Sequence, residues 1–195
     1  MVNQEAKKEY RNSLRSRKLI KVALLQLMLE NDISRIKVKE VIEIADISKG
    51  TFYAHYTDVF NVLEEIENEN ILLLRDYLQA QPRVELINDF SPFIIKVFNN
   101  IEANLDFYKI LFATKNAKSF LNKMQKVFVD YMMEDHMMLT KLKNREEAML
   151  FFSFISIGTA NLLQDWFNCK CDISLEGLAK LLNECIVNGV GAIKK

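Results

Sequence analysis

The chain has 195 residues, half of them apolar and 27% charged, a composition that excludes disordered and fibrous classes and fits a globular protein. Only five glycines and two prolines occur, so long stretches without helix breakers favour an all-α fold. The net charge is zero, yet residues 1–57 hold 11 Lys and Arg against 7 Asp and Glu, a balance of +4, and residues 58–195 hold 15 against 19. The basic end is a weak indication of an anionic partner.

Several classes of protein are disfavoured by particular segments. The N-terminal segment is polar, so we predict no signal peptide, and the most apolar window, Ala148–Leu163, is too short and too polar to span a membrane. Cys169, Cys171 and Cys185 are an odd number with no histidine nearby, so we expect reduced thiols in a cytoplasmic protein and no metal site. No nucleophile–base pair or phosphate loop indicates an enzyme, and no cofactor is expected.

Apolar residues recur at helical spacing along most of the chain, and no strand alternation or internal repeat is present. Ser48 is a good N-cap for the third helix and Asp58 for the fourth, while Pro82 and Pro92 punctuate the region that follows. The pattern predicts helices over about 14–30, 38–44, 49–55, 58–78, 84–103, 106–113, 117–139, 145–168 and 174–190.

The second and third predicted helices are short and are separated by a three-residue turn, which is the helix-turn-helix pattern. Phe52 and Tyr56 share one face of the third helix and are expected to pack inward. The outer faces carry a cation, a glycine, a phenol, a hydroxyl and an imidazole, groups that suit phosphates and base edges. Gly50 costs helix stability, about 0.5–1 kcal/mol relative to alanine, so we expect it to allow close approach to DNA.

The segment Lys37–Leu63, KVKEVIEIADISKGTFYAHYTDVFNVL, resembles the DNA-binding region of the TetR family of transcriptional regulators. The run SKGTFYAH carries most of this resemblance, and Trp166–Leu182 is similar to the ending of one branch of the family. The resemblance implies a three-helix DNA-binding domain with a helix-turn-helix over residues 1–57. A larger helical domain for ligand binding and dimerisation would follow over 58–195, with the helix of about 58–78 as connector.

The resemblance also implies DNA contacts from residues of the helix-turn-helix, and three departures from the family pattern bear on them. Lys37 replaces a threonine that caps the second helix and bonds a phosphate, Val59 replaces a phosphate-binding lysine, and Asp46 replaces a turn glycine. Lys37 loses the cap but keeps a cation, Val59 loses its phosphate contact outright, and Asp46 brings a modest strain cost, so we expect weaker DNA binding than in typical members. The predicted DNA-binding residues are Lys37, Lys49, Gly50, Thr51, Tyr53 and His55.

The predicted helix over 145–168 is apolar around nearly its whole circumference, so all its sides must be buried. We expect one side to face the chain's own core and another to face a second subunit; the alternative is a core helix of a monomer. The predicted interface residues are Phe152, Ile155, Leu163, Trp166, Leu178 and Leu182.

A family domain of this kind often encloses a pocket, and the second part of the chain has the flexible and aromatic residues for one. Such residues also serve as plain core, which is the competing interpretation of each. The residues predicted to line a pocket for a small hydrophobic or amphipathic effector are Phe107, Tyr108, Phe112, Phe128, Met132, Phe151 and Phe154.

These expectations combine into one functional hypothesis, a sequence-specific transcriptional regulator that binds double-stranded DNA. We expect a ligand-responsive repressor that acts as a homodimer on a palindromic operator. The alternatives are a helical protein-interaction module, or a transcriptional activator, with weakened or altered operator binding. The operator sequence and the effector do not follow from the sequence.

Overall fold

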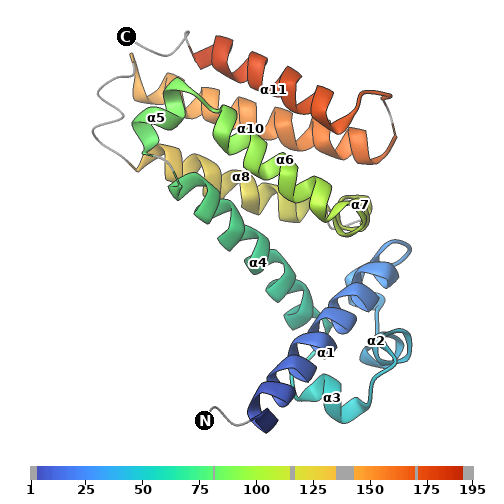
Figure 1. Cartoon of the computed structure of the whole chain (residues 1–195). Helices are drawn as coiled ribbons and strands as arrows, with labels where there is room; N and C mark the ends of the chain where they lie inside the picture. Colours follow the sequence, from blue (N-terminus) through green and yellow to red (C-terminus); the bar gives the residue numbers. More distant parts are fainter. Residues whose placement is uncertain (1–3, 81, 115–116, 135–142, 170, 191–195) are drawn as a thin grey trace. The chain divides into compact units, whose positions relative to one another are not determined.

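The computed structural model describes residues 4–80, 82–114, 117–134, 143–169 and 171–190. Over these ranges the chain is helical and has no strand, which confirms the all-α fold (Figure 1). Its contacts divide it into two compact units: residues 1–69, with which 114–117 group, and residues 70–113 with 118–195. The division falls within helix α4 (Val59–Gln79), whereas the predicted domain boundary, residue 57, lies just before that helix.

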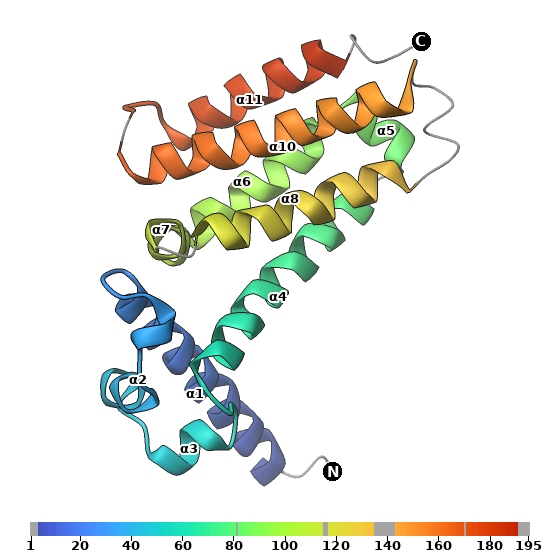
Figure 2. The ribbon, with the colours of Figure 1, turned by 180° about the vertical axis from the view of Figure 1, so that it is seen from behind.

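The first unit is built on helix α1 (Gln4–Met28), which contacts both α2 (Val38–Ala45) and α3 (Lys49–Tyr53), as Figures 1 and 2 show. A short 3-10 turn (Ile33–Arg35) joins α1 to α2. Helix α1 begins well before the predicted start near residue 14, because residues 7–12 form an exposed, polar helical extension that shows no apolar stripe. The core of this unit includes Ile20, Leu24, Met28, Val41, Phe52, Val62 and Ile66.

The turn between α2 and α3 depends on Asp46, which adopts the left-handed conformation with φ 50° and ψ 53°. Its backbone N–H bonds the carbonyls of Glu43 and Ile42, and the N–H of Ile47 also reaches the Ile42 carbonyl. An aspartate accepts positive φ at lower cost than most residues other than glycine. Asp46 thus adopts a left-handed conformation at the position where a glycine was expected.

The second unit packs the end of α4 with α5 (Arg83–Asn88), α6 (Ser91–Ala103), α7 (Leu105–Ala113), α8 (Ala117–Met133), α10 (Arg145–Phe167) and α11 (Leu175–Val190). Helices α10 and α11 lie side by side in both views (Figures 1 and 2). The largest fully buried side chains here are Leu78, Leu86, Phe90, Leu111 and Phe152.

The helix predicted over 84–103 is two helices, α5 and α6, in the structure. Asp89 is extended, with φ −149°, and its carboxylate accepts the N–H of Ser91 at 2.9 Å, which starts α6. Pro92 then occupies the first turn of α6, where its missing N–H costs nothing. The single predicted helix was therefore wrong at this point, because the proline marks a start and not an interior position.

A hydrogen bond joins the two sides of the turn that connects α10 to α11. The indole Nε1 of Trp166 donates to the carbonyl of Ile173 at 2.7 Å, across a turn in which Cys169 has φ 55°. The Trp166 ring also meets Phe167 edge-on, with 5.0 Å between ring centroids. Trp166 is the only tryptophan in the sequence.

Two general properties of the described residues bear on function. None of their helices is long and apolar enough to cross a membrane. Cys169, Cys171 and Cys185 are exposed free thiols, and the described residues include no group of three His, Cys, Asp or Glu side chains that could hold a metal ion.

Candidate nucleic-acid interface and internal cavity

Helix α3 is short, and its capping residue organises its first turn. Ser48 Oγ accepts the backbone N–H of Thr51 at 3.0 Å and lies 2.8 Å from the Thr51 hydroxyl. Phe52, fully buried, anchors the helix, with its ring centroid 5.9 Å from that of Tyr56. One face of α3 is therefore fixed in the core of the first unit, and the opposite face is left to solvent.

The solvent side of α3 carries three of the predicted DNA-binding residues. Lys49, Gly50 and Tyr53 are exposed, and Thr51 is half-buried against Ser48. The Lys49 Nζ lies 5.9 Å from the centroid of the Tyr53 ring, at the outer limit of a cation–π contact. The structure thus brings a cation, a phenol and an uncovered stretch of backbone together on one exposed surface.

Neither the backbone conformation nor the packing around residue 50 requires a glycine there. The φ of Gly50 is negative, so the backbone does not need a glycine, and a Cβ built there has Ser48 Oγ, at 3.7 Å, as its nearest neighbour. That distance is an ordinary van der Waals contact. The packing of α3 on α2 therefore does not explain the glycine.

His55 lies at the end of the same motif and is half-buried. Its Nε2 is 2.7 Å from the hydroxyl of Ser16, a buried residue of α1 whose hydroxyl is also 3.0 Å from the Asn12 and Ser13 carbonyls. Burial, and to a lesser degree the nearby Arg17 guanidinium, lowers the pKa of His55 below its ordinary value of 6.5, and Glu65 partly opposes this. Neutral His55 thus ties the end of the motif to α1.

Next to His55, charged groups of α1 and α4 form a small network within the first unit. Lys21 Nζ lies 2.8 Å from Glu65 Oε1 and also pairs with Glu69, while Arg17 is 3.5 Å from Glu65. The bonds from Lys21 lower the pKa of Glu65 although burial opposes them. Burial and the Glu65 charge raise the pKa of Tyr56, so its phenol stays neutral.

Sequence reasoning missed this network and the Ser16–His55 bond. Their partners are 39 to 48 residues apart along the chain, and neither end carries a local signal of the pairing. Only the known packing of α1 against the motif would have suggested them.

The departures from the family pattern have visible consequences. Lys37 is exposed at the start of α2 and makes no capping bond through its side chain; its backbone N–H donates to Glu40 Oε2 at 2.8 Å. Val59 is buried at the start of α4, where Asp58 Oδ1 accepts the N–H of Asn61 at 2.9 Å. The first turn of α4 therefore presents no cation at this position.

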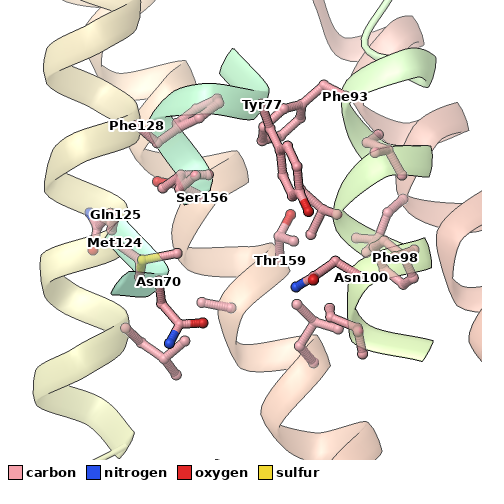
Figure 3. Close-up of a pocket in the computed structure, with 18 of the residues that line it drawn as sticks. Asn70, Tyr77, Phe93, Phe98, Asn100, Met124, Gln125, Phe128, Ser156 and Thr159 are labelled. Carbon is pink, nitrogen blue, oxygen red and sulfur yellow. The ribbon is translucent and has the colours of Figure 1, made fainter. Parts of the chain in front are cut away.

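The second unit contains a cavity of about 170 Å³ among helices α4, α6, α7, α8, α10 and α11 (Figure 3). Three of the predicted pocket residues, Tyr108, Phe112 and Phe128, line it. Sequence reasoning missed most of the lining, because the cavity draws its residues from six helices that are far apart in the sequence. The lining residues labelled in Figure 3 are Asn70, Tyr77, Phe93, Phe98, Asn100, Met124, Gln125, Phe128, Ser156 and Thr159.

The other four predicted pocket residues lie outside this lining. Met132 is fully buried in the core, and Phe151 packs against that core from a half-buried position. Phe107 stacks edge-on with Tyr108 at 5.3 Å between centroids. Phe154 is 74% exposed and points to solvent, so its placement in a pocket is corrected.

The predicted interface residues also require a correction. Phe152, Ile155, Leu163, Leu178 and Leu182 are buried in the core of their own chain, and Trp166 is half-buried against it. The exposed apolar residues of α10 instead include Leu150, Phe154 and Ile157, at positions i, i+4 and i+7, which we call the α10 stripe. Further exposed apolar residues are Met149 and Leu162 on α10, and Leu181 and Val187 on α11.

Comparison with known proteins agrees with this architecture. Residues 88–188 match a TetR-type family model described as a transcriptional regulator C-terminal region. A 47-residue stretch, 24% of this chain, is 40% identical to an uncharacterized HTH-type transcriptional regulator, YxbF, of Bacillus subtilis (strain 168). That stretch spans only 12% of the length of YxbF.

Solved structures of similar fold cover nearly the whole chain. The fatty acid degradation regulator FadR from Bacillus halodurans has a TM-score of 0.64 at 16% identity, covering 89% of this chain and 95% of its own. The dihydroxyacetone kinase operon activator DhaS has a TM-score of 0.62 at 16% identity, covering 92% and 98%. At such low identity these two structures bear on the fold alone.

Proposed function

Because this chain belongs to the TetR family of transcriptional regulators, we propose that it is a ligand-responsive repressor that binds a palindromic operator as a homodimer. The observation that supports the proposal is that α3 has one face buried in the core and the opposite face exposed to solvent. Phe52 is fully buried, while Lys49, Gly50 and Tyr53 are exposed beside one another. An exposed cation, phenol and bare backbone on a helix-turn-helix suit phosphates and base edges in a major groove.

The proposed DNA contacts are Lys37, Lys49, Gly50, Thr51, Tyr53 and His55. His55 has one nitrogen committed to Ser16, so only Nδ1 remains for DNA. The Ser16 hydroxyl donates its one hydrogen to the Asn12 and Ser13 carbonyls, so His55 Nε2–H donates to Ser16 Oγ and Nδ1 of the neutral ring is an acceptor. A phosphate contact through Nδ1 therefore requires a second proton on the imidazole. In this role Ser16 acts as a positioning residue for His55.

Two features of the second unit support the proposed homodimer and the proposed effector. The α10 stripe exposes large apolar side chains that a second copy would cover, and the cavity offers space for a small molecule. The effector would act by population shift, favouring a state of the dimer that does not match two successive half-sites on DNA.

The test is selection of binding sites from fragmented DNA of the source genome, at low salt, with the full chain. We expect enrichment of a palindromic sequence, whose affinity then falls steeply with added salt as phosphates regain their counterions. Tyr53→Ala should weaken binding, while Tyr10→Ala, at an exposed tyrosine of α1, serves as the matched control. Absence of any enriched palindrome would contradict the proposal.

Two alternative functions have a specific observation behind them. Buried Val59 removes a cation from the start of α4, which favours a protein-interaction module that has lost operator contact. A similar fold occurs in a protein named as an operon activator, so activation is the other alternative. A reporter gene driven from the selected operator separates repression from activation, and failure of the selection favours the interaction module.

A further inference from the structure

The lining of the cavity in the second unit carries no charge. Of the described residues that form it, none is Asp, Glu, Lys, Arg or His. Its polar members are all neutral: the amides of Asn70, Asn100 and Gln125, and the hydroxyls of Tyr77, Tyr108, Ser156 and Thr159. The cavity is therefore apolar with a few neutral hydrogen-bonding groups.

Part of this polar set is already paired within the protein. Asn100 Nδ2 donates to the Tyr108 hydroxyl at 2.6 Å, and that hydroxyl donates to Asn70 Oδ1 at 3.0 Å. Burial raises the pKa of Tyr108 to about 12, so the phenol stays protonated at neutral pH. This relay ties α4, α6 and α7 together and has an evident structural role.

Two hydroxyls in the lining are not used in this way. Among the described residues, no side chain or carbonyl is hydrogen-bonded to the Tyr77 or Thr159 hydroxyl. In Figure 3 both hydroxyls and the amide of Asn100 point toward the middle of the cavity, from α4, α10 and α6 respectively. Tyr77 and Thr159 are half-buried residues. A hydroxyl that faces an apolar cavity without a protein partner offers a hydrogen bond to a molecule that fills the cavity.

We propose that this cavity binds an uncharged, largely apolar molecule whose single hydroxyl or carbonyl group is held by Tyr77 and Thr159. The proposal deepens the effector role proposed above and rests on it. It assigns the chemical class of the effector, and it excludes carboxylates, phosphates and amines in their ionised forms.

The exclusion follows from desolvation. An ion that leaves water for an apolar cavity loses its hydration, and only an opposite charge with good hydrogen bonds compensates for that loss. The described lining offers none, whereas a neutral hydroxyl loses far less and regains its hydrogen bonds from Tyr77 and Thr159. Discrimination by head-group charge is thus expected to exceed discrimination by chain length.

The experiment uses three probes with one alkyl chain: 1-decanol, decanoate and decylammonium, titrated into the full chain at pH 7.5, where both ions are charged. Calorimetry should show binding of 1-decanol, with each ion weaker by at least about tenfold. An ion that binds as tightly as the alcohol would overturn the proposal. It would also be overturned if no member of the series from 1-hexanol to 1-dodecanol binds.

Variants test the two hydroxyls. Tyr77→Phe and Thr159→Val keep the shape of the side chain, and each should weaken 1-decanol binding by about three- to tenfold. Tyr131→Phe is the matched control, because the Tyr131 hydroxyl donates to the Leu78 carbonyl and Tyr131 does not line the cavity. A Tyr77→Phe/Thr159→Val double variant with unchanged affinity for 1-decanol would contradict the assignment of these residues.

Operator binding without effector keeps this inference separate from the proposed function. A chain that binds its operator but fails the head-group test contradicts only the effector class. If the chain binds 1-decanol more tightly than the two ions but enriches no DNA sequence, only the proposed repressor function is contradicted.

Discussion

Gly50 occupies a helical position at which the protein itself has no need for a glycine. The backbone there is ordinary, and a methyl group would fit beside Ser48. A residue that lowers helix propensity without a benefit in packing points to a requirement outside the chain. On the proposed function, that requirement is the close approach of DNA to α3.

Gly50→Ala should therefore have opposite effects on folding and on binding. The free energy of unfolding should rise by up to about 1 kcal/mol, from the better helix propensity of alanine. Operator affinity should fall by about tenfold, because the methyl group meets the DNA surface. Urea denaturation and fluorescence anisotropy with labelled operator measure the two quantities on the same preparation. Unchanged affinity would show that the glycine does not serve DNA binding.

The titration of His55 makes the stability of the protein depend on pH. Because burial lowers the pKa of His55 in the folded chain, the unfolded chain binds the proton more tightly. The free energy of unfolding should thus fall as the pH drops through 6.5 toward the lowered pKa, and it should be constant in this respect above pH 7.5.

Denaturation in urea at several pH values between 5.5 and 8 measures this effect, with His55→Gln as the comparison. Glutamine can keep a bond to Ser16 but does not titrate, so the variant should lose the pH dependence attributed to His55. A wild-type curve that is parallel to that of the variant would contradict the shift.

The side of helix α10 that faces the core could not be predicted from the sequence. The apolar residues of α10 cover nearly the whole circumference, so periodicity predicted a buried helix but gave no preferred direction for the core. Phe152, predicted to lie in the dimer interface, is consequently buried in the core, and Phe154, predicted to line the pocket, is exposed to solvent. Which side of such a helix faces its own core depends on the packing of α6, α8 and α11, which no local pattern encodes.

Other elements could be predicted because the local chemistry is decisive. The turn with Asp46, the Ser48 cap and the inward Phe52 all follow from residue types and spacing, and the structure confirms them. The DNA contacts of α3 stay predictions. The cavity was only partly predictable, since its shape arises where six helices leave a gap between them.

The α10 stripe leads to a prediction about assembly. Phe154→Glu should convert a homodimer into a monomer, since a carboxylate in a buried apolar interface costs several kcal/mol when unpaired. Ile95→Glu, on α6 at 55% exposure, is a matched control and should leave the dimer intact. Sedimentation equilibrium measures the mass of each variant. A Phe154→Glu chain that keeps the wild-type mass, or a wild-type chain that is monomeric, would rule out this interface.

Positive and negative charge are unevenly distributed along the chain. Residues 1–57 have 11 basic and 7 acidic residues, and residues 58–195 have 15 and 19. Attraction to DNA should therefore depend on cations of the first segment, and a lysine of the second unit should contribute little to counterion release.

Lysine-to-glutamine variants test this separation. Lys37→Gln and Lys49→Gln should each reduce the slope of log affinity against log salt by about 1, if each lysine neutralises one phosphate. Lys96→Gln, an exposed position on α6, should leave the slope unchanged. Operator titrations at four salt concentrations provide the slopes, and equal slopes for all three variants would contradict the assigned contacts.

The position of Trp166, whose indole donates to the Ile173 carbonyl, has a practical consequence. The chain has one indole, and it lies in the second unit, at the junction of α10 and α11. Its emission is therefore a built-in optical reporter of that unit alone. Melting of the helices around the cavity can be followed through this one chromophore, while dye-labelled operator reports on α3 in the same cuvette.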